Sequence, residues 1–121
     1  MDVIQRSRLA QRYLDEGAPL AAVETLRPVE AELAESAAGQ LLLARAYYHT
    51  AQLTKAERGF ARVVELHPTD DYARFALGRT LERQSRLREA ATHYRVAAAL
   101  SSRPEYRDRL AAVDNRLNPA A

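Results

Sequence analysis

The sequence predicts an all-α protein built from stacked helical hairpins, and three observations support this prediction. Helix-forming residues dominate the 121-residue chain, which has 24 alanines and 17 arginines, whereas β-branched residues are sparse. The sequence also repeats itself at one constant interval. Within each copy, apolar residues recur three and four positions apart, which is the spacing of one face of a helix. At this length we expect a single domain covering residues 1–121.

Six columns carry the repeat when the sequence is aligned with itself at an offset of 34 without gaps. In the middle copy, Ala44 and Ala56 are small enough for two helices to approach closely, and Tyr47 and Phe60 fill the space beside that contact. Such a hairpin cannot bury its apolar face alone, so neighbouring hairpins must stack. The columns are Leu9, Leu43 and Leu77; Ala10, Ala44 and Gly78; Tyr13, Tyr47 and Leu81; Ala22, Ala56 and Ala90; Leu26, Phe60 and Tyr94; and Val29, Val63 and Ala97.

Residues that favour helix ends place the six helices of the three copies. Asp2, Ser36 and Asp70 are candidate N-caps for the first helix of each copy. Gly17 favours a left-handed end to the first helix, and Pro19 suits the first turn of the next one. The copies are expected at about 3–36, 37–70 and 71–103, with helices near 3–15, 19–33, 37–50, 54–66, 71–84 and 88–101.

Local features inside the copies lead to three further expectations. Thr54, with Glu57 three residues later, is a candidate capping box that opens the second helix of the middle copy. Pro28 lies midway in the predicted helix 19–33, where it should kink that helix or end it early, leaving 29–35 as a separate turn. Gly59 costs its helix about 1 kcal/mol relative to Ala. Because the equivalent residues in the other copies are larger, close packing is not required throughout this column.

A seventh helix is expected after the third copy, over residues 104–117. Pro104 suits the first turn of this helix. Tyr106, Leu110, Val113 and Leu117 then follow helical spacing, and polar residues lie between them. A stack of repeats needs a terminal element that is apolar inside and polar outside. We therefore expect residues 104–117 to form a capping helix.

The column pattern, L-[AG]-x2-[YL]-x8-A-x3-[LFY]-x2-[VA], resembles the tetratricopeptide repeat, a helix–turn–helix unit that recurs at this same interval. The resemblance covers residues 3–102. It departs from the family pattern at Arg6, Gln40 and Arg74, where the repeat usually has Trp. The resemblance implies an α-solenoid: a right-handed superhelix of three hairpins plus the capping helix, with seven helices in all.

The resemblance also implies a concave groove, lined by the first helix of each hairpin, that accepts a peptide or a partner helix. Apolar and aromatic residues alternate with arginines at these positions, and aromatic residues and Arg are enriched at binding hot spots. We therefore expect a partner with apolar side chains and at least one carboxylate. The alternative is that these aromatic residues complete the packing between hairpins. The expected groove residues are Gln11, Leu41, Arg45, Tyr48, His49, Tyr72, Phe75, Arg79, Glu82 and Arg83.

One specialised form of groove is not expected here. Some tetratricopeptide domains hold the C-terminal carboxylate of a chaperone peptide with a clamp of Lys, Asn, Asn, Lys and Arg. The corresponding positions in this chain are Ser7, Gln11, Leu42, Tyr72 and Ala76. Only Gln11 offers a similar polar contact, so an adaptor for chaperone tails is disfavoured.

The sequence lacks the residue patterns of an enzyme. It has no cysteine, which excludes disulfides, thiolate metal sites and a cysteine nucleophile. His49, His67 and His93 show none of the short spacings of metal ligands, and no nucleophile elbow is present. The four glycines are too far apart for a phosphate-binding loop. We therefore expect a non-catalytic protein without a cofactor or metal.

Charge and hydropathy bear on the remaining partner classes. The net charge is only +2, and acidic residues are interspersed among the basic ones, so a nucleic-acid partner is the least favoured class. No run approaches 18 apolar residues, so we expect no membrane partner and a cytoplasmic location. The bias toward Arg and Ala suggests a bacterial source. Self-association into a homo-oligomer, through the groove or the terminal helices, stays open as an alternative to the interaction scaffold.

Overall fold

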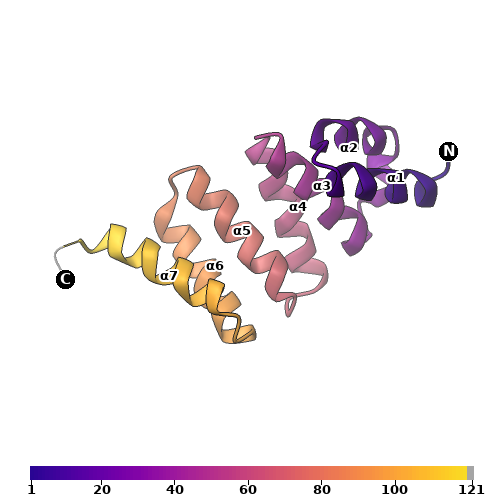
Figure 1. Cartoon of the computed structure of the whole chain (residues 1–121). Coiled ribbons are helices and arrows are strands. Elements are labelled where there is room, and N and C mark those ends of the chain that lie inside the picture. Colours follow the sequence, from indigo (N-terminus) through magenta and orange to yellow (C-terminus); the bar gives the residue numbers. More distant parts are fainter. Residues whose placement is uncertain (120–121) are drawn as a thin grey trace.

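The computed structural model describes residues 1–119, and within them the chain folds into seven α-helices and one 3-10 helix. Successive helices form three hairpins, α1 with α2, α3 with α4 and α5 with α6, and α7 packs against the last of them (Figure 1). The elements are α1 (Val3–Asp15), α2 (Pro19–Leu26), η1 (Arg27–Leu33), α3 (Ala37–His49), α4 (Leu53–Leu66), α5 (Asp71–Arg83), α6 (Leu87–Leu100) and α7 (Pro104–Leu117).

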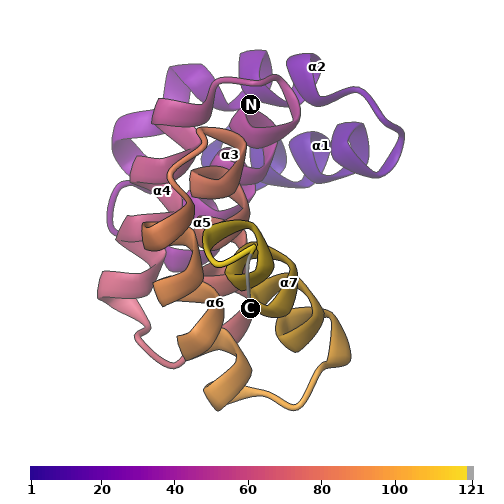
Figure 2. The same ribbon diagram turned by 90° about the vertical axis from the view of Figure 1, so that its left-hand side faces the viewer.

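The hairpins stack into an α-solenoid, as the sequence predicts. The first hairpin lies at one end of the stack and α7 at the opposite end (Figure 1). Viewed along the stack, α4 and α6 lie on one side and α7 and α1 on the other (Figure 2). Within residues 1–119, no helix is long and apolar enough to cross a membrane.

The repeat columns form the core. The small residues Ala22, Ala56 and Ala90 have no exposed surface, and Phe60 and Tyr94 are at most 1% exposed beside them. At Gly78, an added Cβ would lie only 2.7 Å from the ring of Tyr94. Tyr94 is the largest residue of the column Leu26, Phe60 and Tyr94, and it packs against a glycine where the other two copies have Ala10 and Ala44. The alternation of small and large side chains predicted from the sequence is therefore confirmed.

The three turns inside the hairpins share one left-handed backbone conformation. The second residue after each first helix has a positive φ, 76° at Gly17, 59° at Ala51 and 61° at Ser85. These positions occupy one column of the repeat alignment, so the left-handed turn is part of the repeat. Gly adopts this conformation freely, whereas Ala and Ser are strained there. Only the first copy has the residue that suits the turn.

Most of the predicted helix ends are confirmed. The side chains of Asp2, Ser36 and Asp70 each accept a hydrogen bond from a backbone N–H in the first turn of the helix that follows. Pro28 does end its helix early, because α2 stops at Leu26 and the chain continues as the 3-10 helix η1.

One expectation about α4 is wrong, and one contact in it was not predicted. Its N-cap is Gln52, and no side chain caps it, so Thr54 and Glu57 form no capping box. The Glu57 carboxylate instead accepts hydrogen bonds from Arg86 (2.7 Å) and Gln84 (3.0 Å) in the turn of the next hairpin. Gly59 is a close contact as well, since an added Cβ would lie 2.8 Å from Cβ of Ala44.

The last helix, α7, is fixed to α5 by a buried aromatic contact and by a hydrogen bond to a partly exposed carboxylate. The Tyr106 ring lies 4.6 Å from that of Phe75, and its hydroxyl donates to Asp71 at 2.7 Å. Burial, and then the hydrogen bond to Asp71, raise the pKa of Tyr106, so the phenol stays a donor. Neither Tyr106 nor Val113 has any exposed surface, which confirms that residues 104–117 cover the end of the core.

Candidate functional site

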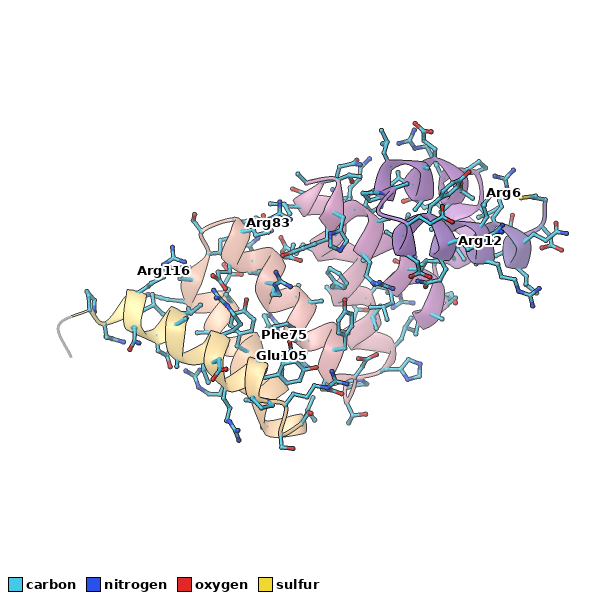
Figure 3. All side chains as sticks on the ribbon, viewed as in Figure 1. Arg6, Arg12, Phe75, Arg83, Glu105 and Arg116 are labelled. Atoms are coloured by element: carbon cyan, nitrogen blue, oxygen red, sulfur yellow. The ribbon has the colours of Figure 1, made fainter. Side chains whose placement is uncertain are left out.

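A cationic groove runs between α3, α5 and α7. Its deepest part is a recess of about 50 Å³ with an apolar floor, which includes Phe60, Phe75 and Ala76. It opens into a wider, shallower groove of about 600 Å³ whose far wall is α7, and Figure 3 shows Arg83 and Phe75 on α5 with Glu105 on α7. The recess is lined by Arg45, Tyr48, His49, Phe60, Tyr72, Phe75, Ala76 and Arg79, and the wider groove adds Glu82, Arg83, Glu105 and Arg109.

Tyr48 organises the charged side chains around this recess. The guanidinium carbon atoms of Arg83 and Arg79 lie 4.6 Å and 5.5 Å from the centre of the Tyr48 ring, within range of cation–π attraction. Arg83 also donates a hydrogen bond to the Tyr48 carbonyl oxygen at 2.9 Å. The ring of His49 meets that of Tyr48 edge to face, with centroids 5.3 Å apart. Two guanidinium groups and an imidazole are thus held around one aromatic ring.

The positive charge in the groove is not neutralised by nearby acids. Among residues 1–119, no carboxylate lies within salt-bridge distance of Arg45, Arg79 or Arg83. Burial, followed by the charges of these three arginines, lowers the pKa of His49 and keeps its imidazole neutral at pH 7. An anion entering the groove would therefore meet guanidinium groups for which no carboxylate in the described part of the chain competes.

Glu82 lies in the groove wall but is already engaged. Its carboxylate accepts a 2.7 Å hydrogen bond from the buried Tyr94 hydroxyl, pairs with Arg109 and lies 3.6 Å from Arg116. Its side chain is 15% exposed. Burial and this hydrogen bond raise the pKa of Tyr94, so its hydroxyl remains protonated. Glu82 thus holds α7 in place and does not cancel the charge of the free arginines.

The structure brings six of the ten predicted groove residues together as accessible side chains around the recess and its mouth. Tyr72 is 42% exposed at the rim, although large apolar residues are usually covered. The other five are Arg45, Tyr48, His49, Arg79 and Arg83.

The other predicted residues have different environments. Phe75 does not lie off the packing face: it is 7% exposed and packs between the rings of Tyr94 and Tyr106, so only its edge reaches the recess. For Phe75, the alternative that an aromatic residue completes packing is correct. Leu41 packs against the core and lines neither the recess nor the wider groove. Gln11 lies apart from the cationic groove.

Gln11 lines a separate depression between α1, η1 and α3. There its amide donates a hydrogen bond to Asp15, at 2.9 Å. The accessible surface of this depression is mainly apolar, and Ile4 in its lining is 62% exposed. The depression between α1 and α3 and the recess between α3 and α5 have some repeat columns in common, among them the column of Gln11 and Arg45.

Two groove residues on α7, Glu105 and Arg109, were not predicted from the sequence. Arg109 falls in the repeat column of Phe75, one copy later, and Glu105 falls in the column of Asp71. Continuing the groove columns beyond the third copy would have identified Arg109, because Leu41 and Phe75 share its column, but not Glu105, whose column contains no predicted groove residue. The helix 104–117 is therefore a cap for the core and also a wall of the groove.

The site holds no evident catalytic arrangement of side chains. His49 is surrounded by arginines, with no carboxylate oriented toward it in the described part of the chain. Within residues 1–119, no group of three or more His, Cys, Asp or Glu side chains is placed to hold a metal ion. What the geometry offers is an apolar recess bordered by unpaired guanidinium groups.

Comparison with known proteins agrees with the repeat read from the sequence. A family model described as "Tetratricopeptide repeat" matches residues 13–72. No curated protein sequence is significantly similar to this chain.

Several solved structures share the fold at low sequence identity. The first tetratricopeptide domain of Spaghetti (RPAP3), solved with an HSP90 peptide, superposes with a TM-score of 0.86 and 17% identity, covering 94% of this chain and 91% of that one. MamA MSR-1 C2 gives 0.87 and 22%, covering 97% and 68%. The translocator chaperone SycD of Yersinia enterocolitica gives 0.77 and 17%, covering 97% and 81%. With its three repeat copies, its stacked hairpins and the matching family model, the chain belongs to the tetratricopeptide repeat family.

Proposed function

We propose that this protein is a non-catalytic interaction scaffold whose cationic groove binds a segment of another protein carrying an apolar side chain and a nearby carboxylate. The observation that carries the proposal is the juxtaposition of Arg45 and Arg79 with an apolar recess. Neither guanidinium has a carboxylate partner within residues 1–119. A ligand of this chemistry would bury apolar surface and supply the missing counter-charge in one contact.

The two parts of the groove make different contributions to recognition. The apolar floor of the recess removes the end of an aliphatic side chain from water, which favours binding by about 25 cal/mol per Å² buried. The guanidinium groups attract an acidic segment over a distance and can donate two parallel hydrogen bonds to its carboxylate. Because Tyr48 holds Arg79 and Arg83 by stacking, less side-chain freedom is lost when the ligand binds.

Neighbouring structures support a peptide ligand. The first tetratricopeptide domain of Spaghetti (RPAP3) is bound to the HSP90 peptide SRMEEVD, and the second domain of human RPAP3 is in complex with the HSP70 peptide SGPTIEEVD. Both peptides combine aliphatic and acidic residues. This chain lacks the clamp residues for a C-terminal carboxylate at Leu42, Tyr72 and Ala76, so we propose the same ligand chemistry held by a different set of arginines.

Selection from a displayed library of random peptides tests this proposal without assuming a partner. We expect the wild-type chain to enrich peptides that carry Asp or Glu close to Leu, Ile, Val or Met. The Arg79→Glu variant should lose these peptides and enrich Lys or Arg in their place, because reversing the charge in the groove reverses the preferred ligand. Arg88→Glu is the matched control, since Arg88 is exposed on α6 outside the groove.

Three results would contradict the proposal. One is a selected set with no acidic preference. Another is an unchanged preference in Arg79→Glu. The third is an equal change in Arg79→Glu and Arg88→Glu, which would indicate an effect of net charge alone. Both variants should unfold cooperatively at temperatures close to that of the wild type, because neither arginine forms an ion pair within residues 1–119 and Arg79 loses only its exposed cation–π contacts.

A further inference from the structure

Charge is distributed unevenly along the solenoid. Residues 1–36 contain seven acidic and four basic side chains, a net charge of −3, whereas residues 71–121 contain six acidic and ten basic ones, a net charge of +4. The first hairpin and α7 lie at opposite ends of the stack (Figure 1). The molecule therefore has an acidic end and a basic end, and one chain cannot bring the two together.

The acidic end also exposes apolar side chains. Of the five large apolar residues that are most exposed within residues 1–119, three belong to the first copy of the repeat or directly precede it: Met1 (64%), Ile4 (62%) and Leu20 (56%). Leu20 lies on α2, four residues before Glu24, so the two side chains share a face of the helix. Glu24 is exposed and has no ion-pair partner in the described part of the chain.

This pair is particular to the first hairpin. In the other two copies the column of Leu20 contains Thr54 and Arg88, which are polar and exposed. Solvent exposure at this position therefore suits a polar residue, and packing inside the hairpin gives no reason for a leucine. The face formed by Leu20 and Glu24 matches the ligand chemistry of the cationic groove, namely an aliphatic side chain beside a carboxylate.

We propose that α2 of one copy docks into the cationic groove of a second copy, with Leu20 entering the recess and Glu24 pairing with Arg79. This inference rests on the proposed function, because it uses the same groove. The contact is head-to-tail: a pair keeps one free groove on one copy and one free α2 on the other, so the assembly extends as a chain or closes as a ring. The second copy and a partner protein compete for the groove, so binding of a partner releases the self-associated form.

Analytical ultracentrifugation of complementary variants tests this head-to-tail contact. The wild-type chain should show a weight-average mass that rises above 13.5 kDa with concentration and returns toward it in high salt. Glu24→Arg reverses the charge of the docking face and keeps the groove, whereas Arg79→Glu reverses the charge of the groove and keeps the docking face. Each variant alone should remain a monomer. An equimolar mixture should recover the concentration-dependent rise in mass, because each groove then meets an α2 of opposite charge, the native pair in one contact and the charge-swapped pair in the next.

Several outcomes would overturn the inference. They are a wild-type chain that stays monomeric at every concentration, self-association that survives in Glu24→Arg, or a mixture whose mass does not rise. Leu20→Ser is a second variant, since it should weaken self-association without any change in charge. The peptide selection separates this inference from the proposed function: Glu24→Arg should enrich the same acidic peptides as the wild type. If it does so while the wild type stays monomeric, only the self-association is wrong.

Discussion

The close contact between Gly59 and Ala44 gives a stability prediction that the structure makes quantitative. In Gly59→Ala, the new Cβ would lie 2.8 Å from Cβ of Ala44, whereas carbon atoms pack without strain at about 3.5–4.0 Å. Helices α3 and α4 must therefore move apart by about 1 Å to restore that spacing. Overpacking of this kind costs about 1–3 kcal/mol, and the better helix propensity of Ala returns about 1 kcal/mol. We expect a net loss of about 1 kcal/mol from these two effects together.

The exchange Ala44→Gly with Gly59→Ala isolates this contact. Ala44→Gly alone should cost about 1 kcal/mol through helix propensity. In the double variant the two propensity effects cancel and the overlap is relieved, so its free energy of unfolding should return to within about 0.5 kcal/mol of the wild type. Urea unfolding followed by circular dichroism measures all four proteins. Losses that simply add in the double variant would refute the argument that this contact sets the distance between α3 and α4.

Three further predictions concern strain, pH and the attachment of α7. Ala51→Gly should raise the free energy of unfolding by about 0.5–1 kcal/mol and Gly17→Ala should lower it by a similar amount, because both positions have a positive φ; urea unfolding that ranks them otherwise would contradict this. Burial, and then the charge of Arg74, lower the pKa of His93, so the folded state binds a proton less readily than the unfolded chain. Unfolding free energy should therefore fall as the pH drops below about 6.5, with a shallower fall in His93→Gln; equal pH profiles would contradict this. Glu82→Ala should lower the free energy of unfolding in urea by about 1–3 kcal/mol, because it leaves the buried Tyr94 hydroxyl on α6 and the guanidinium groups on α7 without their acceptor. A decrease below about 0.5 kcal/mol is less than a typical hydrogen bond contributes, and it would show that the Glu82 carboxylate does not fix α7.

The features that sequence analysis predicted well depend on helical periodicity or on interactions within a single turn. Apolar residues that recur at the repeat interval, such as Ala56 and Ala90, had to lie on the inner faces of hairpins, and the structure buries them. Helix ends were predictable where one side chain acts within its own turn, as at Asp70, or where a ring blocks a backbone position, as at Pro28.

The errors arose where a residue serves a distant partner. Glu57 has the spacing of a capping box, but its carboxylate is taken by Arg86, 29 residues later, because an ion pair between hairpins outweighs a local cap. Phe75 does line the recess, but its position in the helix also suggested that it lies off the packing face, whereas Tyr106 on α7 covers it. The close approach at Gly59 was missed because helix propensity does not report the distance to a neighbouring helix.

Within the candidate site, the sequence predicted which side chains share the groove but not which of them are free. Arg45, Arg79 and Arg109 all line the groove, yet of these three only Arg109 has a carboxylate partner within residues 1–119, Glu82. That difference depends on how α7 packs, which no repeat column encodes. The free arginines were therefore identified from the structure, and they determine the expected charge of the ligand.

The central claim, that a partner binds in the cationic groove, is tested most directly by a nuclear magnetic resonance titration. The isotopically labelled chain is titrated with the peptide that the library selection enriches most. We predict that the shifted backbone amides lie on α3, α5 and α7, around Tyr48, Tyr72 and Arg79, while those near Arg62 and Arg88 on α4 and α6 stay unchanged. Shifts confined to α4 and α6 would contradict the account.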